Sequence, residues 1–199
     1  MTIIHRSDRR RFVGGLAAAG VAGLSLPSLI RRAGAQEELA PTPACDDGDE
    51  PTPRQTEGPF FTPSSPERSL LRDEGVAGTP IVLSGVVLTR SCRSVAGALV
   101  DLWHADDAGV YDNDGFRLRG HQFTGADGRY RFETIVPGLY PGRTRHFHVK
   151  YQAPDQPVLT TQLYFPGEPD NERDGIFRPE LLLAMEGNTA SFVTVLDIA

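Results

Sequence analysis

The chain has 199 residues, enough for one domain with a sizeable hydrophobic core. Its formal net charge is −6, but residues 1–35 hold six arginines and one aspartate, so the remainder carries 14 basic and 25 acidic residues and a net charge of −11. An acidic domain of this kind argues against binding to nucleic acid or to an anionic membrane surface.

Residues 1–35 have the pattern of an export signal. Residues 8–13 read Asp-Arg-Arg-Arg-Phe-Val, which resembles the twin-arginine consensus, and a weakly apolar run over residues 13–30 follows. Residues 33–35 are Ala-Gly-Ala, a cleavage site of small residues. An uncleaved membrane anchor is the alternative, but Pro27 and several glycines make the run a poor spanning helix. We therefore expect twin-arginine export to the periplasm or the cell exterior, with no stable membrane association after cleavage.

Residues 36–79 are expected to form an irregular N-terminal arm, because Pro, Asp, Glu and Thr dominate its first part. Within it, residues 55–63 are expected to be structured, and residues 68–75 to form a charged connection with a single helical turn. Cys45 in the arm and Cys92 are the only cysteines. In an oxidising compartment such a pair is a disulfide candidate worth roughly 2–4 kcal/mol of stability, and two independent thiols are the alternative.

Residues 80–199 are expected to form one all-β domain. Runs rich in β-branched residues and leucine predict strands at residues 81–88 and 98–103, and residues 123–124 and 130–132 flank an Ala-Asp-Gly-Arg hairpin signal. Further strands are predicted at residues 146–151, 159–165 and 191–196, with a brief helix at residues 180–185. Short strands between Gly, Pro and Asp, without a long helical period, are typical of a single-domain β-sandwich.

The residues most suited to chemistry are two histidines and two tyrosines. His146 and His148 are two apart on a predicted strand, so both imidazoles point to the same face. Two imidazoles make half of a metal site, and Tyr111 and Tyr140, each beside a glycine-containing turn, are candidates to complete it. Two nitrogens and two hard anionic phenolates suit Fe(III) better than Zn(II) or Cu(I).

Five segments around these residues resemble the intradiol ring-cleavage dioxygenases, a family that uses non-haem ferric iron. They are Gln-Thr-Glu-Gly-Pro-Phe-Phe at 55–61, Trp-x-Ala-x-x-x-Gly-x-Tyr at 103–111, Pro-Gly-x-Tyr-Pro at 137–141, His-x-His at 146–148 and Thr-Gln-Leu-Tyr-Phe at 161–165. The resemblance runs from about residue 53 to residue 166 and follows the family's order. Only five residues separate Tyr140 from His146, and no helical N-terminal domain is evident, so the chain resembles a short, exported branch.

The resemblance implies one Fe(III) per chain, held by Tyr111, Tyr140, His146 and His148. It also implies a catechol-type substrate that is cleaved with O2 to a cis,cis-muconate. By position, Tyr140 would be displaced by the substrate and take up its proton, although the sequence cannot order the two tyrosines. Arg143, three positions before His146, would lie over the substrate ring.

Other residues around the site also have expected roles, of which that of Gln162 is what the resemblance implies. Gln162 would line the pocket, whereas Tyr164 is expected to be a packing residue. Arg145 would alternate to the opposite face as a surface charge. Trp103 is expected to be a buried strand aromatic that supports the Tyr111 loop. Residues 55–61 fit either a position at the mouth of the site or a Gly-Pro turn with two core phenylalanines.

Other functions stay open from the sequence. An exported transthyretin-like β-sandwich could bind a ligand without catalysis, and a copper or zinc hydrolase could use the same fold. The acidic loop that contains Asp106, Asp107, Asp112 and Asp114 could bind calcium, but its spacing differs from that of an EF-hand loop, which favours a solvated loop. The identity of the catechol and the quaternary structure, including a homo-oligomer, are also open.

Overall fold

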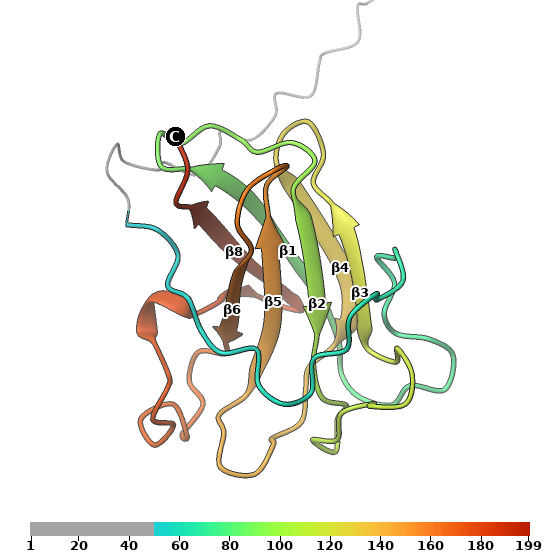
Figure 1. Cartoon of the computed structure of the whole chain (residues 1–199). Helices are drawn as coiled ribbons and strands as arrows, with labels where there is room; N and C mark the ends of the chain where they lie inside the picture. The colour runs from blue at the N-terminus through green and yellow to red at the C-terminus, as the bar shows by residue number, and fades with distance from the viewer. Residues whose placement is uncertain (1–49) are drawn as a thin grey trace, which may run out of the picture. The chain divides into compact units, whose positions relative to one another are not determined.

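The computed structural model describes residues 50–199, which form two packed four-stranded sheets (Figure 1). One sheet has the strand order β4-β1-β8-β7 and the other β3-β2-β5-β6. All neighbouring strands are antiparallel except β1 and β8, which are parallel. The strands are β1 (Pro80–Thr89), β2 (Leu99–Trp103), β3 (Arg119–Phe123), β4 (Arg129–Ile135), β5 (His146–Gln152), β6 (Leu159–Tyr164), β7 (Ala184–Glu186) and β8 (Thr189–Leu196). The structure therefore confirms the all-β sandwich.

Strand β5 shows how the residue pattern selects the two faces of a sheet. Phe147, Val149 and Tyr151 are fully buried and belong to the core between the sheets. Because side chains alternate along a strand, His146, His148 and Lys150 lie on the outer face of the β3-β2-β5-β6 sheet. The two histidines are nevertheless buried, at 4% and 3% exposure, so another part of the chain must cover this face.

The cover is the segment of residues 50–71, which we call the strap. It starts beside β8, where the Thr52 amide donates to the Val195 carbonyl, and passes β6, where the Gln55 amide donates to the Thr160 carbonyl. It then crosses in front of β6, β5 and β2, as Figure 1 shows.

The end of the strap closes the opposite side of the sandwich. Residues 66–68 pair with His121 at the edge of β3, and residues 69–71 pair with Glu133 at the edge of β4. The backbone groups of both edge strands are thereby partly satisfied, which protects them from pairing with other chains. One irregular segment thus covers the outer face of one sheet and links the two sheets.

Some sequence-based predictions of local structure were wrong. The brief helix predicted at residues 180–185 is limited to a 3₁₀ helix, η1 (Pro179–Leu181), and from Leu182 the chain is extended into β7. The reason is tertiary, since the Leu183 amide donates to the Tyr164 carbonyl at the edge of β6. Residues 68–75 contain no helical turn: residues 68–71 pair with β3 and β4, and the Val76 amide then donates to the Asp73 carbonyl across a turn in which Gly75 has a φ of +84°. Strand β3 begins four residues before the predicted start at Phe123.

The predicted export signal and the first part of the arm lie outside the described residues, as does Cys45. Cys92, on the turn between β1 and β2, is disulfide-bonded. Residues 50–79, the described part of the predicted arm, contain no helix or strand apart from isolated bridges. Among residues 50–199 there is no helix with the length and apolar character needed to cross a membrane.

Candidate metal centre

The two histidines of β5 are oriented by different neighbours. The Nδ1 atom of His146 lies 2.6 Å from the backbone carbonyl oxygen of Thr144, so Nδ1 carries the proton and Nε2 has the lone pair. The ring of His148 is stacked on the indole of Trp103, which is directly opposite it on β2, with ring centroids 4.9 Å apart and an interplanar angle of 9°. The Nε2 atoms of the two histidines are 3.1 Å apart.

Both imidazoles are neutral at physiological pH. Burial lowers the pKa of His146 to about 4 and that of His148 well below its usual value of 6.5. A neutral imidazole offers a lone pair to a metal ion. The buried Nδ1 atom of His148 has no hydrogen-bond partner among the described residues, so stacking on Trp103, rather than a hydrogen bond, holds this ring.

Tyr111 reaches the histidines from the loop that follows β2. Its hydroxyl oxygen lies 3.4 Å from Nε2 of His146, and its ring is stacked on Phe60 of the strap at 4.6 Å. Gly109 makes this loop possible: its φ is +82°, and a Cβ there would overlap with the carbonyl oxygen of Leu139. Burial raises the pKa of Tyr111 well above its usual value of 10, so its phenolate requires a cation in the site.

Tyr140 completes the group from the loop between β4 and β5. It is half-buried, and its ring meets those of Tyr111 and Phe60 edge to face, at 6.0 and 5.3 Å. These four predicted ligands line one cavity of about 30 Å³. The other lining residues are Gly58, Pro59, Phe60 and Arg143.

The cavity suits a single metal ion. Its volume of about 30 Å³ exceeds the roughly 10–15 Å³ that one water molecule needs, so an ion fits. The donors that face it are two imidazoles and two phenols, a hard set that matches Fe(III). Among residues 50–199 there is no group of three or more His, Cys, Asp or Glu side chains placed to hold a metal.

Arg143 lies beside the cavity and is held by two side chains. Its Nε donates to Oδ2 of Asp174 at 2.8 Å, and its Nη2 donates to Oε1 of Gln162 at 2.6 Å. Gln162 in turn donates to the Thr56 carbonyl of the strap. The predicted pocket residue Gln162 therefore contacts Arg143 and the strap, and it is not among the residues that line the 30 Å³ cavity.

Asp174 is a functional candidate that the sequence analysis missed. Its side chain is only 2% exposed, and besides Arg143 it accepts hydrogen bonds from the amides of Thr144 and Ile176, at 3.0 and 3.1 Å. It therefore fixes both Arg143 and the chain that leads to His146. In the sequence it is one of four acidic residues between 168 and 174, and nothing local distinguishes it from the others.

Arg119 is a second missed residue. It is 1% exposed, and its guanidinium donates to the carbonyls of Asp112, at 2.6 and 2.8 Å, and of Phe60, at 2.6 Å. It thereby joins the loop next to Tyr111 to the strap. The preceding residue, Leu118, has a φ of +56°, a strained value for a bulky residue, and such strain is common beside functional sites.

The remaining predicted residues have mixed outcomes. The strap segment serves both roles considered for it, because Gly58, Pro59 and Phe60 line the cavity while Phe61 packs on Trp103. Trp103 is buried and packs with Tyr111, and Tyr164 is fully buried. Arg145 is not a free surface charge: it forms a half-buried ion pair with Glu168 at 2.7 Å and donates to the Pro137 carbonyl.

In the acidic loop, the carboxylates of Asp106 and Asp112 accept hydrogen bonds from nearby backbone amides. Asp106 also pairs with Arg117 at 3.2 Å. These contacts explain the conformation of the loop without a bound ion.

Comparisons with known proteins agree on one family. A family model described as dioxygenase matches residues 56–191. The chain is 31% identical over 144 residues to the hydroxyquinol 1,2-dioxygenase of Nocardioides simplex, covering 60% of this chain and 49% of that protein. It is 36% identical over 119 residues to the protocatechuate 3,4-dioxygenase beta chain of Burkholderia cepacia, covering 51% of each. The chain thus spans about half the length of the curated relatives it matches.

Solved structures show the same likeness. The dioxygenase domain of a dioxygenase carbohydrate-binding protein fusion from Streptomyces sp. SirexAA-E is 55% identical, with a TM-score of 0.72, and the match covers 75% of this chain and 100% of that domain. The catechol 1,2-dioxygenase from Pseudomonas arvilla C-1 is 30% identical, with a TM-score of 0.65, and the match covers 74% of this chain and 62% of that one.

Proposed function

Because this chain belongs to the intradiol ring-cleavage dioxygenase family, we propose that it cleaves the ring of a catechol-type substrate between the two hydroxyl-bearing carbons. The second substrate would be O2, and the product would be of the cis,cis-muconate type. The observation that carries the proposal is the convergence of Tyr111, Tyr140, His146 and His148 around one small cavity. One non-haem Fe(III) per chain would be held by these four residues, and when bound it would activate the catechol toward O2.

The size of the cavity requires a side chain to move when substrate binds. A cavity of about 150 Å³ accommodates benzene, whereas this one measures about 30 Å³. Tyr111 is a poor candidate for movement, since it is 7% exposed, stacked on Phe60 and positioned by Gly109. Tyr140 is half-buried, and two residues later Gly142 has no neighbouring side chain within 4 Å of its Cβ position. Tyr140 is therefore the better candidate to leave, and its phenolate oxygen can take up a substrate proton as it does so.

Arg143 would act electrostatically. It lines the cavity, and Asp174 and Gln162 fix the direction of its guanidinium. A fixed cation at the edge of a largely buried site stabilises negative charge that develops on the substrate ring, without reorganising during the reaction. The neutral histidines contribute no competing positive charge.

We propose further that the protein acts after twin-arginine export, in the periplasm or outside the cell. Support comes from the pattern of residues 8–35 and from the disulfide at Cys92, since disulfides persist mainly in oxidising compartments. N-terminal sequencing of the secreted protein should find a start at residue 36, and retention of residues 1–35 would contradict the proposal.

Metal analysis, visible spectroscopy and an oxygen electrode test the activity together. The iron-loaded protein should be red-brown from charge transfer between tyrosinate and Fe(III), and it should consume O2 when given catechol. Tyr140→Phe should bleach or shift the visible band, and His148→Ala should lose iron. Tyr130→Phe is the matched control, because Tyr130 lies in the core and bonds to Tyr151, and it should leave the band unchanged.

Two outcomes would refute the proposal. A colourless protein with no bound iron and no O2 consumption would leave a β-sandwich that binds ligands without catalysis. Stoichiometric zinc or copper in place of iron would indicate a different metalloenzyme on the same fold.

A further inference from the structure

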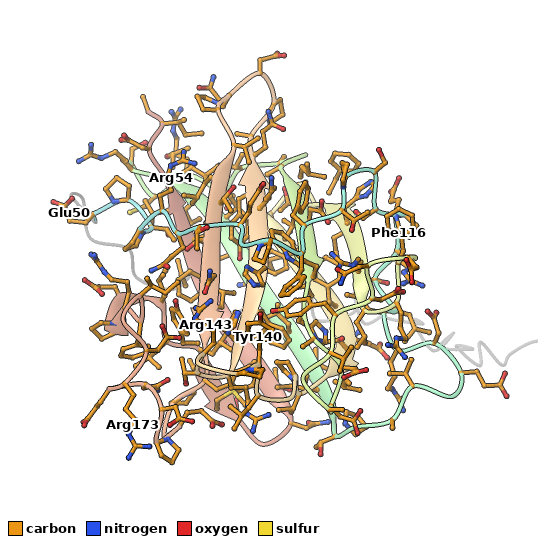
Figure 2. The ribbon with its side chains drawn as sticks, turned by 60° about the horizontal axis from the view of Figure 1, so that its bottom comes forward. Glu50, Arg54, Phe116, Tyr140, Arg143 and Arg173 are labelled. Atoms are coloured by element: carbon orange, nitrogen blue, oxygen red, sulfur yellow. The ribbon has the colours of Figure 1, made fainter. Side chains whose placement is uncertain are left out.

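A second cavity, of about 360 Å³, adjoins the candidate metal centre. Two of its lining residues, Tyr140 and Arg143, also line the 30 Å³ cavity that the four ligand candidates surround. In Figure 2 both labelled side chains lie near the centre of the view, while Arg173, which also lines the second cavity, lies farther out at the lower left. A larger cavity of about 740 Å³ lies along the start of the strap and β8, and no residue of the metal centre lines it.

The position of the second cavity matters because the first is too small for a substrate ring. A ring that binds at the metal centre has to extend beyond this cavity, and Tyr140 and Arg143 are the two lining residues that it shares with the second cavity. Arg143 is fixed by Asp174 and Gln162, whereas Tyr140 is half-buried on a loop with free space beside Gly142. Movement of Tyr140 would join the two cavities, so a group attached to the ring would enter the larger one.

The walls of the second cavity indicate which group it would accept. Leu139, which is 45% exposed, Pro141 and Gly142 supply an uncharged wall. The charged residues that line the cavity form ion pairs: Arg143 is paired with Asp174, and Arg173 is paired with Asp170 at 3.2 Å. With no net charge, the cavity gives no advantage to an anionic substituent, while its uncharged wall can bury apolar surface.

We propose that this second cavity, which we call the substituent pocket, holds a substituent of the substrate ring. The preferred substrates would then be catechols that carry an uncharged, mainly apolar substituent of several heavy atoms. Its volume of about 360 Å³ exceeds the roughly 150 Å³ that accommodates benzene, so substituents up to the size of an aryl ring fit. This inference rests on the proposed function and narrows its substrate class.

The test compares kcat/KM for catechol, 4-butylcatechol and protocatechuate. The kcat/KM for 4-butylcatechol should exceed that for catechol by on the order of tenfold, because each methylene buried against an apolar wall favours the butyl compound over catechol. Protocatechuate, whose substituent is a carboxylate, should show no such gain. Leu139→Trp narrows the substituent pocket and should bring the ratio of 4-butylcatechol to catechol close to one. Leu70→Trp is the matched control, since Leu70 is also half-exposed but lies on the strap outside the pocket. It should leave the ratio of kcat/KM for 4-butylcatechol to that for catechol at the value of the native protein.

Anaerobic dissociation constants for catechol and 4-butylcatechol separate the two proposals, because they do not depend on turnover. Turnover of both compounds with a ratio near one, or an equal loss for both in Leu139→Trp, would overturn the substituent pocket alone. A tenfold tighter anaerobic binding of 4-butylcatechol without any O2 consumption would support the pocket and refute the proposed dioxygenase activity.

Discussion

Replacement of Asp174 by asparagine tests whether this carboxylate positions Arg143 in addition to stabilising the fold. The carboxylate accepts three hydrogen bonds, two at Oδ2, from Arg143 and Thr144, and one at Oδ1, from Ile176. Asparagine has a single acceptor oxygen, and its best orientation keeps the two bonds at the Oδ2 position. The Ile176 amide is then left without an acceptor, and the bond from Arg143 loses its charge assistance.

The expected loss of stability follows from these contacts. An amide left without an acceptor costs about 1–3 kcal/mol when buried, and the low end applies to Ile176 because its bond to Asp174 is only partly buried. A neutral bond has roughly half the strength of a charge-assisted one. Because the side chain of Asp174 is 2% exposed and that of Arg143 is 20% exposed, solvent screening is modest. We expect Asp174→Asn to lower the free energy of unfolding by about 2–3 kcal/mol in urea titrations. We also expect kcat/KM to fall by on the order of tenfold or more, as for other residues that orient active-site groups.

A matched control is available in the same loop. Asp170 forms an exposed ion pair with Arg173 at 3.2 Å, and exposed pairs contribute no more than about 1 kcal/mol. Asp170→Asn should therefore change stability little, and it should also change little the kcat/KM for unsubstituted catechol, which has no substituent to enter the pocket that Asp170 lines. If the two asparagine variants behave alike, the role assigned to Asp174 is wrong.

The pH dependence of stability gives an independent check. Burial opposes ionisation of Asp174, but hydrogen bonds from Ile176, Thr144 and Arg143 outweigh it and lower the pKa below its usual 3.8. A carboxyl group with a lowered pKa stabilises the fold fully above its unfolded pKa, and that stability is lost as the pH falls through the folded pKa. The difference in free energy of unfolding between the native protein and the Asp174→Asn variant should thus be constant near neutral pH and shrink below about pH 4.

Two further substitutions, Gly109→Ala and Arg119→Met, test the contacts that hold the loop of Tyr111, and each has a matched control. Gly109→Ala should lower the free energy of unfolding by more than about 2 kcal/mol, since it combines a positive φ with an overlap with Leu139, whereas Gly142→Ala, with a positive φ in open space, should cost only about 1–2 kcal/mol. Arg119→Met removes three part-buried hydrogen bonds to the backbone carbonyls of Asp112 and Phe60, and it should cost about 3 kcal/mol and weaken iron binding, measured by urea denaturation and competition with a chelator. Arg117→Met, at an exposed ion pair, is its control and should change stability by less than about 1 kcal/mol; equal effects at both arginines would contradict the clamp assigned to Arg119.

The sequence was sufficient for features that depend on local spacing. Alternation along residues 146–151 predicts that His146 and His148 share a face, because successive side chains of a strand point to opposite sides, and the core position of Phe147 agrees. The order of the motif segments also indicated the family. Where tertiary pairing overrides local preference the prediction was wrong, as at residues 182–185, which are not helical because Leu183 pairs with the edge of β6.

The composition of the site depended on contacts between distant segments. Asp174 is 31 residues from Arg143, and Arg119 is 59 residues from Phe60, so no local pattern relates them. The strap covers the histidines because each of its ends is hydrogen-bonded to both sheets, the first end to β8 and β6 and the second end to β3 and β4. Residue types and spacing therefore determined which side chains can bind a metal and which face they occupy. Only the packing of the loops and the strap decided that the hydroxyl of Tyr111 lies 3.4 Å from His146, since that distance is set by backbone and side-chain contacts among segments far apart in the chain.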